Sequence, residues 1–135
     1  MKFHSLQLRL PCSNAQEILK TLDIAPQESR RVRDFYFSNS KGILKLRSIN
    51  QKAELLFYQR EIYHNLALVS GEKSEIGSLQ DTKDILARFF SLSCAIERTQ
   101  TVFQIGKVWL FHEKVDTAAQ PNQFVKLVCP LPEEA

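Results

Sequence analysis

Polar and apolar residues alternate along most of this chain. Near the N-terminus, leucines at positions 6, 8 and 10 alternate with Ser5, Gln7 and Arg9. A period of two is typical of a strand with one buried face. Together with runs of β-branched and aromatic residues, the same pattern predicts eight strands, with a short hairpin link at Ile105-Gly106. These strands are expected over residues 3–10, 31–37, 43–48, 53–60, 65–70, 95–103, 107–114 and 123–129.

Two segments have a helical pattern instead. Ser13 followed by Gln16 is a capping-box signal and predicts a helix over residues 14–22. Its expected apolar stripe consists of Ile18, Leu19 and Leu22. Ser78 followed by Asp81 predicts the start of a second helix over residues 79–92. Its expected buried face consists of Leu79, Ile85, Leu86, Phe89 and Phe90.

The order of these elements predicts a single α+β domain over residues 1–135. Eight strands with short connections are enough to close an antiparallel barrel, which removes exposed strand edges. The two helices would then pack on the outside or plug one end. The proline-bearing segment 129–135 is expected to be a loose tail.

The composition of the chain argues against several classes of protein but does not indicate a function. The chain has 135 residues, of which 44% are hydrophobic and 24% charged, as in ordinary globular domains. Its 18 basic and 15 acidic residues give a net charge of +3, too small to require a nucleic-acid partner. No apolar run approaches the roughly 20 residues of a membrane helix, and the alternating N-terminus is unlike a signal peptide. We therefore expect an intracellular, cytoplasmic protein that does not associate with membranes.

Cysteines and histidines form no recognisable site. The cysteines are odd in number, widely spaced and without a CxxC pair, so we expect buried or half-buried free thiols at Cys12, Cys94 and Cys129. The histidines lack ligand spacing such as HxxxH. They are His4, His64 and His112. Strand alternation also points His112 away from Glu113.

The polar faces of the predicted strands are rich in cations. They carry Arg9, Lys45, Arg47, Glu54, Tyr58, Arg60, Arg98, Gln100, Glu113 and Lys126. On the outside of a barrel, water and salt would screen these charges. On the inside, like charges on neighbouring strands would need a polyanion between them.

The middle of the chain, RDFYFSNSKGILKLRSINQKAELLFYQRE, resembles the CYTH domain of the triphosphate tunnel family. That family includes class IV adenylyl cyclases and thiamine- and inorganic-triphosphatases. The resemblance rests on Asp34, Tyr36, Phe37, Gly42, Leu44, Lys45, Leu46, Arg47, Ala53, Glu54, Leu55, Tyr58 and Arg60. It extends along nearly the whole chain by the order of the elements. It implies an eight-stranded antiparallel tunnel with the polar faces inside.

The resemblance also implies a set of cations that grip a triphosphate through charge-assisted contacts. Lys45, Arg47 and Arg60 match that set directly, while Arg9 and Arg98 stand at positions where the family has lysine. Lys126 adds a sixth cation on the last strand. Two further family arginines are replaced, by Gln100 and Trp109.

The acidic residues that hold a divalent metal in the family are mostly missing. Ser5 and Gln7 stand at the two glutamates of the N-terminal signature, and Lys126 and Val128 stand at the Glu-x-Glu of the last strand. Glu113 occupies the place of a metal-binding aspartate, with Glu54 as a second candidate ligand. Mg²⁺ or Mn²⁺ usually needs more carboxylate oxygen than this. A metal cofactor is therefore expected only if the protein is an active enzyme.

Three functions remain open on these grounds. The first is a catalytically impaired tunnel that binds a triphosphate-like or other polyanion, or acts as a protein-interaction module. The second is an active divalent-metal-dependent triphosphatase or adenylyl cyclase with a diverged metal site. The third uses the surface cluster Arg30, Arg31 and Arg33 to contact nucleic acid or protein, although such clusters more often protect a strand edge. A homodimer is compatible with each.

The tunnel assignment changes what the net charge means. Six inward cations and the two candidate carboxylates would give the interior a charge of +4, leaving 12 basic and 13 acidic residues elsewhere. A concentrated internal charge favours a small polyanion over an extended nucleic acid.

Overall fold

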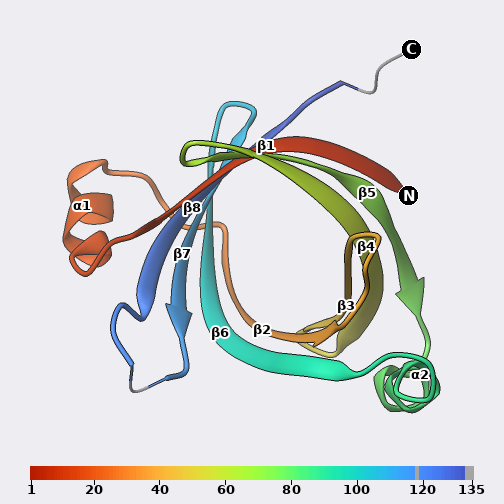
Figure 1. Cartoon of the computed structure of the whole chain (residues 1–135). Coiled ribbons are helices and arrows are strands. Elements are labelled where there is room, and N and C mark those ends of the chain that lie inside the picture. Colours follow the sequence, from red (N-terminus) through yellow and green to blue (C-terminus); the bar gives the residue numbers. More distant parts are fainter. Residues whose placement is uncertain (118, 133–135) are drawn as a thin grey trace.

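The computed structural model describes residues 1–117 and 119–132, which form eight strands and two helices. The strands close into a barrel in the order β1-β5-β4-β3-β2-β6-β7-β8, and every neighbouring pair is antiparallel. Figure 1 shows the strands as a ring with α1 and α2 outside it. The elements are β1 (Lys2–Pro11), α1 (Ala15–Thr21), β2 (Glu28–Phe37), β3 (Ile43–Ile49), β4 (Lys52–Tyr63), β5 (Leu66–Ile76), α2 (Leu79–Leu86), β6 (Leu92–Ile105), β7 (Val108–Val115) and β8 (Gln123–Pro130). The predicted fold class is confirmed.

Strand register brings charged residues of neighbouring strands side by side on the same face of the sheet. Arg47 on β3 lies opposite Asp34 on β2 and Glu54 on β4. Arg9 on β1 lies opposite Lys126 on β8. Residues directly opposite each other in an antiparallel pair share one face of the sheet, so these charges are neighbours across the strands.

Apolar side chains on the outer face of the barrel are covered by the helices. One cluster joins Phe35, Phe37, Leu44 and Leu46 to Leu79, Leu86 and Phe90 from α2 and the turn after it. A second joins Leu19 of α1 to Phe103 and Leu110. The barrel therefore has its hydrophobic core between sheet and helices, because its interior holds charged groups.

Helix α1 departs from its prediction at both its start and its apolar face. Asn14, not Ser13, is the N-cap residue, and it makes no side-chain capping hydrogen bond. Of the expected stripe only Leu19 is buried, whereas Ile18 and Leu22 are 42% and 48% exposed. A helix of 7 residues covers too little of the sheet to bury a wider stripe.

The start of α2 is as predicted, but its end is not. The Asp81 backbone N–H donates to Ser78 Oγ at 3.1 Å, which confirms the cap. The helix stops at Leu86 rather than continuing to residue 92. Ile85 and Phe89 were expected to be buried but are exposed, because only Leu79, Leu86 and Phe90 reach the outer face of the barrel.

Near the C-terminus, the chain stays paired further than expected. Strand β8 includes Cys129 and Pro130, and the Leu131 backbone N–H donates to His4 O at 2.9 Å. The rest of the predicted loose tail, residues 133–135, lies outside the described residues. Among the described helices, none is long and apolar enough to cross a membrane.

The three cysteines are free thiols, but their burial differs from the prediction. Cys12 and Cys129 are half-buried, whereas Cys94 is exposed. Cys94 lies opposite Tyr36 near the start of β6, so it sits at one end of the barrel rather than in its packed middle.

Close approach of β5 to β4 requires glycine at position 71. A Cβ atom added to Gly71 would lie 2.3 Å from the backbone oxygen of Phe57 and 2.4 Å from Tyr58 Cβ. We predict that Gly71→Ala lowers the free energy of unfolding by about 1–3 kcal/mol because the strands must move apart. Chemical denaturation measures this loss. The matched control is Gly77→Ala, whose added Cβ meets nothing within 4 Å; equal stability of both variants would contradict the strand packing.

Candidate functional site

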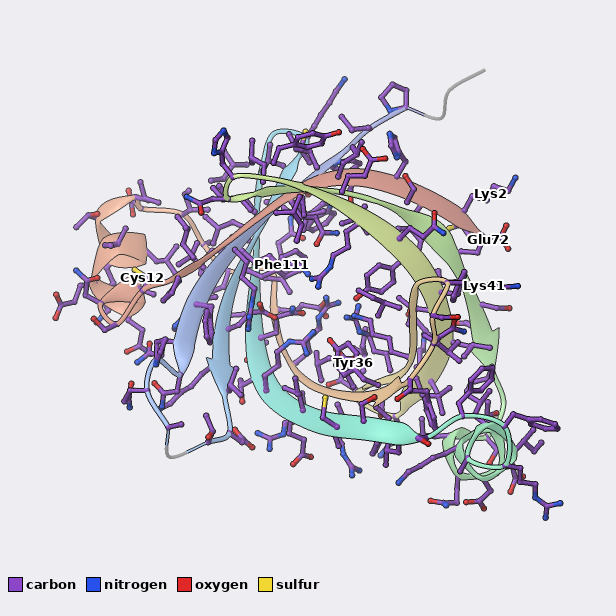
Figure 2. All side chains as sticks on the ribbon, viewed as in Figure 1. Lys2, Cys12, Tyr36, Lys41, Glu72 and Phe111 are labelled. Atoms are coloured by element: carbon purple, nitrogen blue, oxygen red, sulfur yellow. The ribbon has the colours of Figure 1, made fainter. Side chains whose placement is uncertain are left out.

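A single cavity of about 260 Å³ inside the barrel brings together all six cations singled out in the sequence. They are Arg9, Lys45, Arg47, Arg60, Arg98 and Lys126. Glu113 lines the same cavity, but Glu54 does not. Tyr36 and Tyr58 also line it, and Figure 2 shows Tyr36 within the ring of strands. The inward orientation implied by the family resemblance therefore holds for the cations, which strand alternation places on one shared face.

Asp34 is a fully buried carboxylate beside this cavity. Its Oδ1 accepts a hydrogen bond from Arg47 Nε at 2.8 Å, and its Oδ2 accepts from Arg98 Nη1 at 2.8 Å. Lys45 Nζ lies 3.7 Å from Oδ2. Burial by itself would raise the pKa of Asp34, but Arg47, Lys45 and Arg98 outweigh it and hold that pKa well below its usual value. The carboxylate is ionised at neutral pH.

Sequence reasoning missed Asp34 as an inward charge, although it used this residue in the family motif. The signal was present, because Asp34 and Tyr36 are two residues apart and so share a strand face. The pairing of Asp34 with Arg47 became visible only with the register between β2 and β3.

Glu113 is the second buried carboxylate. Its Oε1 accepts from Arg9 Nε at 3.1 Å, and its Oε2 accepts from Arg98 Nε and from Gln100 Nε2. Burial would raise the pKa of Glu113, but the charges of Arg98, Lys126 and Arg9 outweigh it and lower the pKa. Glu113 is therefore held as an anion.

Arg98 connects the two carboxylates. Its Nη1 donates to Asp34 on β2 and its Nε donates to Glu113 on β7, while the residue itself lies on β6. A planar guanidinium can hold two carboxylates at fixed angles, which a lysine ammonium cannot do. The result is a network that fixes Arg9, Arg47 and Arg98 relative to one another.

Lys126 has no such partner. Within residues 1–117 and 119–132 it makes no salt bridge, although it faces Arg47, Arg98 and Arg9. Burial lowers the pKa of Lys126 to about 8, and the attraction of Glu113 offsets this lowering only in part. Arg60, at the mouth of the cavity, likewise makes no salt bridge to any described carboxylate.

Lys45 lies between two aromatic rings at the wall of the cavity. Its Nζ is 5.3 Å from the centroid of the Tyr36 ring and 4.9 Å from that of Tyr58. Burial and the charge of Arg47 lower the pKa of Lys45 well below its usual value, and Asp34 opposes the shift. Lys45 and Lys126 thus lie where the cations of the cavity outnumber the carboxylates that could neutralise them.

The residues of the cavity do not fit a divalent metal. The side-chain oxygens of Asp34 and Glu113 all accept hydrogen bonds, chiefly from arginines. Glu54 is not among the lining residues, so it does not extend the oxygen set of Glu113. In the part of the chain that the structure describes, no three His, Cys, Asp or Glu side chains lie together as a metal site would require.

The cluster of Arg30, Arg31 and Arg33 does not form one surface patch. Arg30 points into the barrel, where its Nε donates to Gln100 Oε1 at 2.7 Å. Arg31 and Arg33 are exposed and form salt bridges with Glu97. The prediction placed all three at a strand edge because it began the strand at residue 31, whereas β2 begins at Glu28.

His112 takes no part in the cavity. It lies on the opposite face of β7 from Glu113, is buried, and its Nε2 is 3.1 Å from Gln123 Oε1. The expectation that it points away from Glu113 is correct.

No family model and no curated protein matches this sequence, but solved structures match its fold over nearly the whole chain. The PH1012 protein of Pyrococcus horikoshii aligns with a TM-score of 0.78 at 14% identity, covering 98% of this chain and 80% of that one. A Hippeastrum protein, described as an adenylyl cyclase candidate with a dominant triphosphatase activity, aligns with a TM-score of 0.71 at 14% identity, covering 98% and 80%. A chain of the Schizosaccharomyces pombe Mediator head module aligns with a TM-score of 0.71 at 7% identity, covering 98% and 84%. The likeness is one of fold, and this chain has the eight-stranded tunnel fold of the CYTH, or triphosphate tunnel, proteins.

Proposed function

We propose that this chain binds a small polyphosphate inside its tunnel without a divalent metal. The observation that supports this most strongly is the imbalance of charge in the cavity. Six cations line it, whereas the only buried carboxylates among the described residues are Asp34 and Glu113. Both carboxylates are already paired with arginines. A polyanion would supply the negative charge that the protein does not.

Five of the six cations divide into two groups in this proposal. Arg9, Arg47 and Arg98 are oriented by the buried carboxylates and keep guanidinium N–H groups that make no bond to Asp34 or Glu113. Lys126 and Arg60 make no salt bridge within the described residues, so the whole charged group of each can contact phosphate. Ordered arginines suit bidentate contacts to phosphate oxygens, and lysines add compact charge beside them.

The size of the cavity favours a small ligand. At about 260 Å³ it lies below the roughly 300–1,000 Å³ of pockets that hold drug-sized molecules. Inorganic triphosphate or a similar compact polyanion fits this limit better than an extended chain does. Nucleic acid is disfavoured for the same reason.

An enzymatic role is the alternative. Triphosphatase activity is described for the Hippeastrum protein of the same fold. The saturated carboxylates argue against it here, because phosphoryl transfer in this family depends on metal ions held by acidic residues. A third role, assembly with protein partners or as a homodimer, is compatible with the fold, since a chain of the Mediator head module shares it.

Binding without metal is the first expectation. We predict that inorganic tripolyphosphate raises the melting temperature in the presence of EDTA, and that Lys126→Met weakens its affinity about tenfold or more, as expected for loss of a charged contact. Calorimetric titration measures the affinity. Arg33→Gln, on the outside of the barrel, serves as the control and should bind normally. A requirement for Mg²⁺ or Mn²⁺ would contradict the proposal.

Binding should also depend on pH. Lys126 is protonated below a pKa of about 8 and neutral above it, and only the protonated form attracts phosphate. We predict that tripolyphosphate affinity falls as pH rises through about 8, and that binding near this pH takes up protons from the buffer. Titrations in buffers of different ionisation enthalpy detect the uptake. The same pH dependence of affinity between about pH 7 and pH 9.5 in the wild-type protein and in Lys126→Met would show that Lys126 does not contact the ligand.

Catalysis is tested by phosphate release. We predict that the protein with Mn²⁺ or Mg²⁺ releases phosphate from tripolyphosphate no faster than the Lys45→Ala/Arg47→Ala variant does, because neither carboxylate is free to hold a metal. A colorimetric phosphate assay measures both rates. Metal-dependent release by the wild-type protein alone would favour the enzymatic alternative.

A further inference from the structure

The tip of the β4–β5 hairpin exposes large apolar side chains at the mouth of the cationic cavity. Ile62, Tyr63 and Leu66 are 64%, 57% and 40% exposed. Single exposed apolar residues are common on protein surfaces. Ile62 and Leu66 differ from such residues because both line the same cavity as the six cations. The mouth is thus apolar where the interior is charged.

The two kinds of wall are close enough for one ligand to touch both. Arg60 and Ile62 are two residues apart on β4, so they project from the same face about 7 Å apart along the strand. This separation is comparable to the length of two linked phosphate groups. A ligand whose phosphates reach Arg60 and the cations beyond it would place its next group beside Ile62.

We propose that the ligand of this tunnel is a polyphosphate ester whose organic group is short and apolar. This inference rests on the proposed function, since the same cations hold the phosphates. The apolar group lies against Ile62 and Leu66, which removes their exposed surface from water. The apolar lining at this mouth is supplied by the side chains of Ile62 and Leu66, which a group of a few carbon atoms is enough to cover.

The test compares three probes in EDTA by calorimetric titration: inorganic pyrophosphate, methyl diphosphate and dimethylallyl diphosphate. Wild-type protein should bind dimethylallyl diphosphate about tenfold more tightly than methyl diphosphate, from the burial of the added carbons. The Ile62→Ser/Leu66→Ser variant should reduce this preference to about threefold or less. Circular dichroism checks that this variant is folded. The comparison of the two esters in the wild-type protein does not depend on the variant.

A matched control removes two exposed apolar residues elsewhere. Ile85 and Phe89 are 58% and 76% exposed and lie on the outside of the barrel, in α2 and in the turn after it. Ile85→Ser/Phe89→Ser should keep the full preference for the dimethylallyl ester. Equal affinity of the wild-type protein for the two esters, or an unchanged preference in Ile62→Ser/Leu66→Ser, would overturn the inference while pyrophosphate still binds. Failure of tripolyphosphate to bind under the same titration conditions would instead contradict the proposed function itself.

Discussion

The bridge from Asp34 through Arg98 to Glu113 is the interaction on which the interior of this barrel depends. Arg98 donates to both carboxylates, and these in turn hold Arg47 and Arg9. Buried charges are tolerated only when they are paired and hydrogen-bonded, and removal of one partner from such a pair typically costs about 3–5 kcal/mol. Among the described residues, every side-chain nitrogen or oxygen atom that is fully shielded from solvent has a hydrogen-bond partner. The network makes a charged interior compatible with a folded barrel.

A charged interior also dictates where the hydrophobic core lies. The apolar faces of β2 and β3 point outward and are covered by α2, while Leu19 of α1 packs on Phe103 and Leu110. The helices therefore cover the apolar outer faces of strands whose inner faces carry charged side chains. Charge pairing is incomplete within the described interior, however. Lys126 makes no salt bridge, and Lys45 Nζ lies 3.7 Å from Asp34 Oδ2, too far for a hydrogen bond. That imbalance is the basis of the proposed polyanion binding.

Much of this arrangement could be predicted because a strand repeats every two residues. Alternation placed Arg9, Lys45 and Arg47 on the polar strand faces, the family resemblance implied that these faces point inward, and the cap at Ser78 marked the start of α2. Alternation puts Asp34 on the same face as Tyr36, but its pairing with Arg47 depends on strand register, and the inward orientation of Arg30 depends on the true start of β2 at Glu28. The exposure of Ile85 and Phe89 depends on how α2 rests on the barrel. The low pKa values of the lysines depend on distances across it.

The central claim is that arginines, rather than a metal ion, pair with the buried carboxylates of Asp34 and Glu113. A crystal structure of the protein with tripolyphosphate and Mn²⁺, recorded at a wavelength sensitive to manganese, tests this directly. We expect phosphate oxygens within hydrogen-bond distance of Lys126 and Arg60, with Arg98 still bridging Asp34 and Glu113 and no manganese signal beside them. A manganese ion bound by Glu113, with Arg98 displaced from it, would contradict the claim.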